Sequence, residues 1–172
     1  MRIGIDLIQR LSKIKMLVTD VDGVMTDGRI ILGDDGEWRR FYSVRDGAGL
    51  HFLVEAGYKT GIITGAASPD VKKRSEHLKF HYLFQKQTDK GPAFDEIKKL
   101  SGYTNEEICY IGDDVFDIPV LKQVGLAVTV PGGMEPVKKV CHYITQNKEG
   151  DGAIRELCDL LLKHGYYAKQ GE

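Results

Sequence analysis

Short apolar runs rich in β-branched and aromatic residues alternate with helical patterns along most of the chain, and this alternation constrains the fold more than any other feature. We expect strands at residues 16–19, 58–64, 81–84, 107–112, 125–130 and 142–145. The helices expected around them cover residues 47–56, 68–78, 90–100, 117–123 and 152–165. This order predicts an α/β fold in which a doubly wound, mostly parallel sheet carries helices on both faces.

An insertion follows the first expected strand. Residues 29–44 contain two β-prone arms around the sequence GDDG at 33–36, which predicts a β-hairpin over about residues 29–42. An isolated two-stranded hairpin is only marginally stable in water. The apolar side chains of this hairpin therefore need a surface on which to pack; they are Ile30, Ile31, Leu32 and Trp38.

Length and charge limit the class of protein. The 172 residues suffice for one domain with a real core, which we expect to span 1–172. The 24 Lys and Arg residues nearly balance the 25 Asp and Glu residues, so no nucleic acid or membrane partner is expected. No apolar run approaches the roughly 20 residues that span a bilayer, and the charged N-terminus lacks the apolar segment of a signal peptide. Three cysteines without CxxC pairing indicate reduced thiols and a cytoplasmic protein.

Polar side chains occur at the ends of three expected strands. In a parallel sheet, ligands bind outside the carboxyl ends of the strands, so we expect these side chains to meet in one crevice. They are Asp20 and Asp22, Thr64 and Gly65, and Asp113 and Asp114.

The acids among them predict a site for a divalent cation. Side chains two residues apart on an extended segment share a direction, so Asp20 and Asp22 can both face the crevice, where Asp113 joins them. A hard cation offsets the repulsion between three carboxylates. Mg²⁺ suits this set because it binds few protein carboxylates and keeps positions for water and phosphate. A calcium loop of the EF-hand type is excluded, because its fifth and twelfth positions would be Val24 and Ile31.

The same groups are suited to phosphoryl transfer. Asp20 is the predicted nucleophile, which would form an aspartyl-phosphate. Asp22 would protonate the leaving alkoxide and would then activate water for the second step. The hydroxyl of Thr64 and the backbone N–H groups at Thr64 and Gly65 can bind phosphoryl oxygens.

Three further residues are expected to support this chemistry. A lysine can balance charge that the metal leaves exposed. Lys90, at the start of a helix, is the best candidate, and Lys86 is its nearby competitor. Asp117, four residues after Asp113, has the spacing of a residue that holds the metal ligands from behind, and Asp114 is expected to help there and to cap the helix.

The motifs DVDGV at 20–24, IITG at 62–65 and GDDVFD at 112–117, together with Lys90, resemble the motifs of the haloacid dehalogenase phosphatases. The gaps between the motifs hold only a hairpin and a few helices and strands. The chain therefore resembles the capless subgroup of that family, which implies a single Rossmann-like domain without a cap domain.

Within the subgroup, residues 12 to 165 resemble the 3-deoxy-D-manno-octulosonate 8-phosphate (KDO 8-phosphate) phosphatases, most specifically in FYSVRDGAG at 41–49 and GDGAIRELCDLLL at 150–162. The resemblance implies a Mg²⁺-dependent phosphatase of lipopolysaccharide biosynthesis. It also implies a homotetramer, in which the hairpin and the C-terminal tail of one subunit cover the neighbour's crevice. The C-terminal helix and tail together are expected at about 150–172. The hairpin could instead pack on its own subunit.

The resemblance also implies which residues meet the sugar phosphate. Arg45 and Arg74 suit this role, because guanidinium groups grip both the phosphate and the carboxylate of such a substrate. The full set is Asp22, Ser43, Val44, Arg45, Asp46, Gly47, His51, Gly65, Arg74 and Lys90.

The chain departs from the family pattern at Ala66, His51 and Asp151, and each departure removes a positive charge near the expected sugar acid. These departures leave open a nine-carbon substrate of the sialic acid type, such as KDN or N-acetylneuraminate 9-phosphate. A non-catalytic subunit is disfavoured, because Asp20, Asp22 and Lys90 are all retained. Transfer of the phosphoryl group to an acceptor other than water also stays open.

Overall fold

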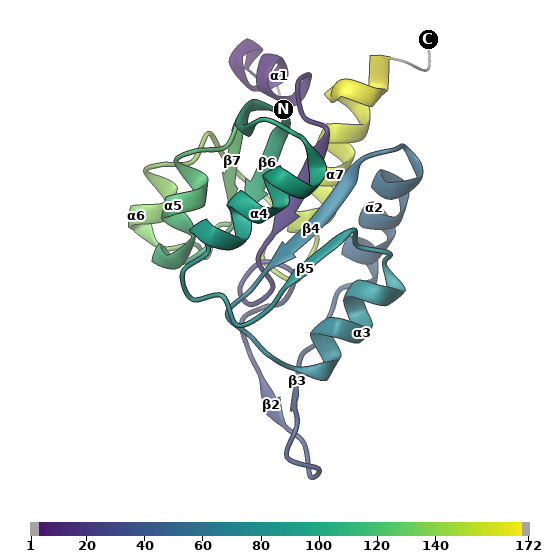
Figure 1. The fold of residues 1–172 in the computed structure, drawn as a ribbon, viewed down its shortest axis with the longest axis vertical. Helices are drawn as coiled ribbons and strands as arrows, with labels where there is room; N and C mark the ends of the chain where they lie inside the picture. Colours follow the sequence, from purple (N-terminus) through teal and green to yellow (C-terminus); the bar gives the residue numbers. More distant parts are fainter. Residues whose placement is uncertain (1–3, 170–172) are drawn as a thin grey trace.

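A parallel sheet forms the centre of the molecule (Figure 1). The computed structural model describes residues 4–169, and within this range the sheet has six strands in the order β5-β4-β1-β6-β7-β8, every neighbouring pair parallel. They are β1 (Met16–Thr19), β4 (Lys59–Ile63), β5 (Tyr82–Phe84), β6 (Ile108–Ile111), β7 (Leu126–Thr129) and β8 (Tyr143–Ile144). The predicted fold class is confirmed, and all six expected strands are present.

Helices cover both faces of the sheet, because successive residues of each strand point to opposite faces. In β1, Leu17 packs into one apolar core, whereas Met16 and Val18 pack into the other. The Leu17 face carries α1 (Ile5–Leu11), α2 (Val44–Glu55), α3 (Pro69–His77) and α7 (Ala153–His164). The opposite face carries α4 (Gly91–Ser101), α5 (Ile118–Leu121) and α6 (Glu135–Lys138).

Several helices differ from their expected bounds for local reasons. The expected helix at 117–123 is a 3₁₀ turn, Val115–Asp117, followed by the short α5, because Asp114 and Asp117 form a capping box just before it. The helix α2 begins three residues early, since the Ser43 hydroxyl accepts from the backbone N–H of Asp46 and caps it. The short helix α6 lies between the expected strands at 125–130 and 142–145, where no helix is predicted.

The inserted hairpin projects from the body of the molecule (Figure 1). It consists of β2 (Ile31–Leu32) and β3 (Trp38–Arg39), paired antiparallel, and is much shorter than the expected 29–42. Its apolar side chains do not pack on their own subunit, because Ile31, Leu32 and Trp38 are 50%, 55% and 46% exposed. The exposure in the single chain therefore does not support the alternative of a hairpin packed on its own subunit.

The strand order fixes where a ligand crevice can form. From β1 the chain proceeds to β4 and β5 on one side, and then returns to β6, β7 and β8 on the other. The carboxyl ends of β1 and β6 therefore flank the point at which the direction reverses, where open α/β sheets bind ligands. Among the described residues, the helices are all too short or too polar to cross a membrane.

Candidate active site

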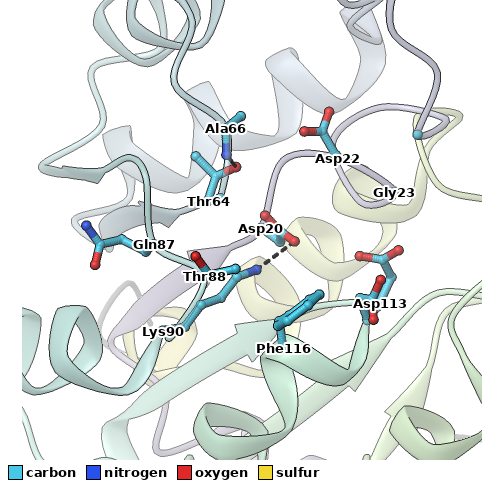
Figure 2. Close-up of a pocket in the computed structure, with 13 residues that line it drawn as sticks. Asp20, Asp22, Gly23, Thr64, Ala66, Gln87, Thr88, Lys90, Asp113 and Phe116 are labelled. Atoms are coloured by element: carbon cyan, nitrogen blue, oxygen red, sulfur yellow. Dashed lines mark hydrogen bonds and ion pairs between the residues drawn. The ribbon is translucent and has the colours of Figure 1, made fainter.

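A cavity of about 400 Å³ opens at the carboxyl ends of β1, β4 and β6 (Figure 2). The predicted residues from the three strand ends and from the start of α4 meet there. The cavity is lined by Asp20, Asp22, Gly23, Gly28, Thr64, Gly65, Ala66, Gln87, Thr88, Lys90, Asp113, Asp114 and Phe116.

Asp20 lies at the bottom of this cavity, directly after β1. Its Oδ1 accepts a hydrogen bond of 2.6 Å from the backbone N–H of Val21, and its Oδ2 lies 2.7 Å from Lys90 Nζ. Burial raises the pKa of Asp20 to about 6, although the Lys90 ammonium opposes this shift. The backbone contact and the ion pair hold the carboxylate in one orientation.

Lys90 is held between two acids. It is 3% exposed, and besides Asp20 its Nζ contacts Asp117 Oδ1 at 2.6 Å. Burial opposes the charge of Lys90, but Asp20 and Asp117 outweigh burial and raise its pKa, so the ammonium stays charged. Lys86, the competing lysine, lines a separate surface hollow beside α3.

Asp117 is fully buried, and both of its oxygens are occupied. Oδ1 accepts from Lys90 and, at 2.6 Å, from the Tyr110 hydroxyl. Oδ2 accepts from the backbone N–H groups of Asp113 and Asp114 at 3.0 and 3.1 Å. These four donors make Asp117 a support for Lys90 and for the loop that carries Asp113. The side chain of Asp114 accepts from the backbone N–H of Val115 and caps the following turn.

A divalent cation fits between Asp20 and Asp113. Carboxylate oxygens of Asp20, Asp113 and Asp117 lie within 4.8 Å of one another. Asp113 Oδ1 is buried and has no hydrogen-bond partner among residues 4–169, and burial, aided by repulsion from Asp20, raises the pKa of Asp113 to about 7. A Cβ atom on Gly23 would collide with the Asp113 carboxylate, so only glycine leaves this space. Because the oxygens of Asp117 are taken, Asp20 and Asp113 are the carboxylates that can bind a cation.

The carboxylate of Asp22 does not join this group, contrary to the prediction that it is a metal ligand together with Asp20 and Asp113. Figure 2 shows it on the cavity wall, pointing away from Asp20. Arg40 holds it there through two ion-paired hydrogen bonds of 2.6 and 2.9 Å. The side chains of Asp20 and Asp22 do not share a direction, although they are two residues apart, because the chain leaves the extended conformation after Thr19.

Thr64 and Gly65 lie where the sequence places them, at the end of β4. The Thr64 hydroxyl accepts a hydrogen bond of 3.1 Å from the backbone N–H of Ala66. Gln87 and Thr88 also line the cavity and were missed by sequence reasoning. The loop between β5 and α4 brings them there, and no motif marks them.

Most of the residues expected to meet a sugar lie outside this cavity in the single chain. Ser43, Val44 and Arg45 line a neighbouring hollow of about 470 Å³ together with Asp27 and Asp151. Arg74 donates to the backbone oxygen of Ser43 at 3.0 Å, and the Arg74 Nε is buried without a partner among the described residues. His51 is exposed on α2 and contacts Glu55 at 3.2 Å. Gly47 is buried against Arg74.

The prediction that Asp46 meets the substrate is not supported, since this side chain is only 2% exposed. Its oxygens accept from the backbone N–H groups of Arg155, at 2.8 Å, and Gly152, at 3.3 Å. Both belong to the start of α7, so Asp46 caps that helix. Burial raises the pKa of Asp46 despite these contacts.

Residues 66–157 match the haloacid dehalogenase-like hydrolase family. The chain belongs to this family. The family match begins after Thr64 and so does not include Asp20. The fold, and relatives that match over most of the chain, extend the family assignment to the segment that carries Asp20.

Several relatives match nearly the whole chain. The 3-deoxy-D-manno-octulosonate 8-phosphate phosphatase KdsC of Yersinia pestis is 41% identical over 91% of this chain and 84% of its own length. The same enzyme of Escherichia coli K12 is 36% identical over 93% of this chain and 85% of its own length. A solved structure of the Moraxella catarrhalis phosphatase, in complex with magnesium, phosphate and KDO, has a TM-score of 0.90, 35% identity and 98% coverage of both chains.

Proposed function

We propose that this haloacid dehalogenase-like protein hydrolyses KDO 8-phosphate to KDO and phosphate with Mg²⁺, through an aspartyl-phosphate on Asp20. The observation that carries the proposal is the buried Asp20 carboxylate, placed between Lys90 and Asp113 at the reversal point of the sheet. The names of the relatives, and the magnesium, phosphate and KDO in the Moraxella catarrhalis structure, support the substrate and the metal.

In the first step, an Asp20 oxygen attacks phosphorus and the bond from phosphorus to the sugar oxygen breaks. Asp22 supplies the proton that the leaving alkoxide takes up. The Thr64 hydroxyl and the backbone at Gly65 face the cavity and bind phosphoryl oxygens. Lys90 keeps a positive charge beside Asp20 throughout, because Asp117 holds it from behind.

In the second step, Asp22 takes a proton from water, which attacks the aspartyl-phosphate and releases phosphate and the free Asp20 carboxylate. A Mg²⁺ ion held by Asp20 and Asp113 would neutralise phosphoryl charge in both steps. Asp117 and Asp114 order the loop that presents Asp113.

The residues expected near the sugar-acid end of the substrate also fit a second candidate. Ala66 lines the cavity, and neither it nor the exposed His51 or Asp151 supplies a guanidinium group. A nine-carbon sialic-acid-type phosphate is therefore the second candidate. Arg45, on the neighbouring hollow, and Arg74, which donates to the backbone oxygen of Ser43 there, are the cations we propose for the carboxylate.

We also propose a homotetramer that acts in the cytoplasm, in lipopolysaccharide biosynthesis. The exposed apolar hairpin supports the assembly, because it lacks a packing surface on its own subunit. In a tetramer, hairpins and tails from neighbours would cover the cavity of a single domain that has no cap. Cys109, Cys141 and Cys158 are free thiols, as expected for a reducing compartment.

Steady-state rates with Mg²⁺ test the substrate. We expect kcat/KM for KDO 8-phosphate to exceed that for p-nitrophenyl phosphate and for KDN 9-phosphate, with one phosphate released for each KDO formed. Equal values for the eight-carbon substrate and the generic ester would contradict the assignment. Phosphate appearing on an added acceptor would indicate a phosphotransferase. The variant Asp20→Asn should lose nearly all turnover, and near-normal turnover would exclude Asp20 as the nucleophile.

A further inference from the structure

Arg40 connects the predicted acid to the hairpin. It follows β3 directly, and its side chain is only 5% exposed, so its guanidinium group is desolvated and depends on its partners. Its Nε donates to Asp22 Oδ1 at 2.6 Å, and its Nη2 donates to Asp22 Oδ2 at 2.9 Å. A bidentate pair of this kind fixes both the position and the plane of a carboxylate.

The remaining nitrogen of Arg40 is attached to a different element. Its Nη1 donates to the Ser68 hydroxyl at 2.9 Å and to Asp70 Oδ1 at 3.2 Å, both at the start of α3. Asp70 Oδ1 also accepts from the backbone N–H of Val71 at 2.8 Å. Arg40 is thus anchored on a helix of the body, and Asp22 is anchored on Arg40.

The place in which Asp22 is held suits one function. In phosphoryl transfer, the attacking and leaving oxygens lie roughly in line on opposite sides of phosphorus. With Asp20 as the attacking group, the acid that protonates the leaving oxygen belongs on the side of the cavity away from Asp20. Figure 2 shows the Asp22 carboxylate lining the cavity away from the cluster of Asp20, Lys90 and Asp113.

We propose that Arg40 is a positioning residue for the reaction, which holds Asp22 on the leaving-group side of the cavity and connects it to the hairpin and to α3. This inference rests on the proposed function, in that it takes Asp22 as the acid and base. Arg40 itself contacts neither the cavity nor the proposed cation.

Kinetics of Arg40→Gln, Arg40→Lys and the matched control Arg10→Gln test the proposal. Arg10 lies on α1, at the far end of the molecule from the hairpin (Figure 1), and its Nε likewise pairs with an aspartate, Asp6, at 3.2 Å. On KDO 8-phosphate, we expect Arg40→Gln to lower kcat by about ten-fold or more with little change in KM, since a positioned acid contributes about 10² to 10⁴ in rate. Arg40→Lys should recover part of the rate, and Arg10→Gln should match the wild type.

Two comparisons distinguish a positioning role of Arg40 from a merely structural one: a second ester with a different leaving group, and the same substitution in the Asp22→Asn variant. The nitrophenolate of p-nitrophenyl phosphate leaves without a proton, and kcat/KM reports only the steps up to formation of the aspartyl-phosphate. The loss of kcat/KM in Arg40→Gln should therefore be much smaller on that ester than on KDO 8-phosphate. In the Asp22→Asn background, Arg40→Gln should cause no further loss, because the two residues act as a unit. Equal losses of kcat/KM on both esters, or losses that multiply in the double variant, would overturn the proposal.

Two measurements keep the outcome decisive. The thermal midpoint of each variant shows whether it folds, and if Arg40→Gln unfolds, the same comparison of esters is made with Arg40→Lys. If the wild type does not hydrolyse KDO 8-phosphate, the proposed substrate fails. The Arg40 and Asp22 variants are then compared on KDN 9-phosphate or another alkyl phosphate that the enzyme turns over. Failure of the proposed substrate is thus distinguishable from failure of the proposed role of Arg40.

Discussion

Asp20 and Asp113 lie close together in a buried site, and their protonation should control cation binding. Burial raises the pKa of Asp20 to about 6 and that of Asp113 to about 7, so protons compete with the cation in this range. As the pH rises through these values, the carboxylates lose their protons and become available as ligands. We therefore expect Mg²⁺ to raise the thermal midpoint more at about pH 8 than at about pH 6.

Differential scanning fluorimetry with and without Mg²⁺ at the two pH values measures this difference. Asp113→Asn is expected to abolish most of the Mg²⁺-dependent shift, while Asp95→Asn, an exposed acid on α4, should keep it. An equal shift at both pH values would show that neither carboxylate exchanges a proton for the metal.

The residues that sequence reasoning located are those for which a strand end dictates the position. Asp20, Thr64 and Asp113 each follow a strand of one parallel sheet, so topology alone brings them together. Asp22 was misplaced because its partner, Arg40, is 18 residues away and belongs to an inserted hairpin. The contact that buries Asp46 is equally distant in sequence, since its partner Arg155 is 109 residues away. Contacts of this kind have no signature in local sequence.

The ends of the helices show which local sequence signals are enough to predict where an element stops. Gly102 ends α4 in the left-handed conformation, with a φ of 73°, as its glycine predicts. Lys79 adopts the same left-handed conformation after α3, with a φ of 56°, although no residue type in the local sequence predicts it. The backbone N–H of Phe80 bonds Ser75 O at 3.0 Å, so the closing geometry forms even though lysine disfavours it.

This unfavourable conformation predicts that Lys79→Gly stabilises the protein. Glycine adopts a positive φ without a clash, and the expected gain in the free energy of unfolding is about 1 kcal/mol, reduced by the greater freedom of glycine in the unfolded chain. Urea unfolding followed by circular dichroism measures the change. Lys72→Gly, at an interior position of the same helix, serves as the control and should lose about 1 kcal/mol. A loss for Lys79→Gly would contradict the backbone argument.

At the scale of the whole molecule, the hairpin is the part that a single chain does not explain. The parallel sheet and its two cores follow from the alternating pattern of the sequence, whereas the hairpin extends away from both (Figure 1). Ile31, Leu32 and Trp38 stay about half exposed on it. Side chains of this kind on a projecting ribbon are stabilised when another surface covers them, and in the proposed tetramer that surface is a neighbouring subunit.

Replacing Leu32 with Glu should therefore weaken the assembly without unfolding the subunit. Leu32 is 55% exposed in the chain, so the charge costs little in the monomer but is buried in a tetramer, where an unpaired charge is strongly unfavourable. We expect light scattering to show smaller species for Leu32→Glu, together with a lower kcat/KM if neighbouring hairpins cover the cavity. Leu100→Glu, an equally exposed site at the end of α4 and remote from the hairpin, should stay assembled and active. A wild-type protein that is monomeric at assay concentration would refute the tetramer, and the hairpin would then need a different partner.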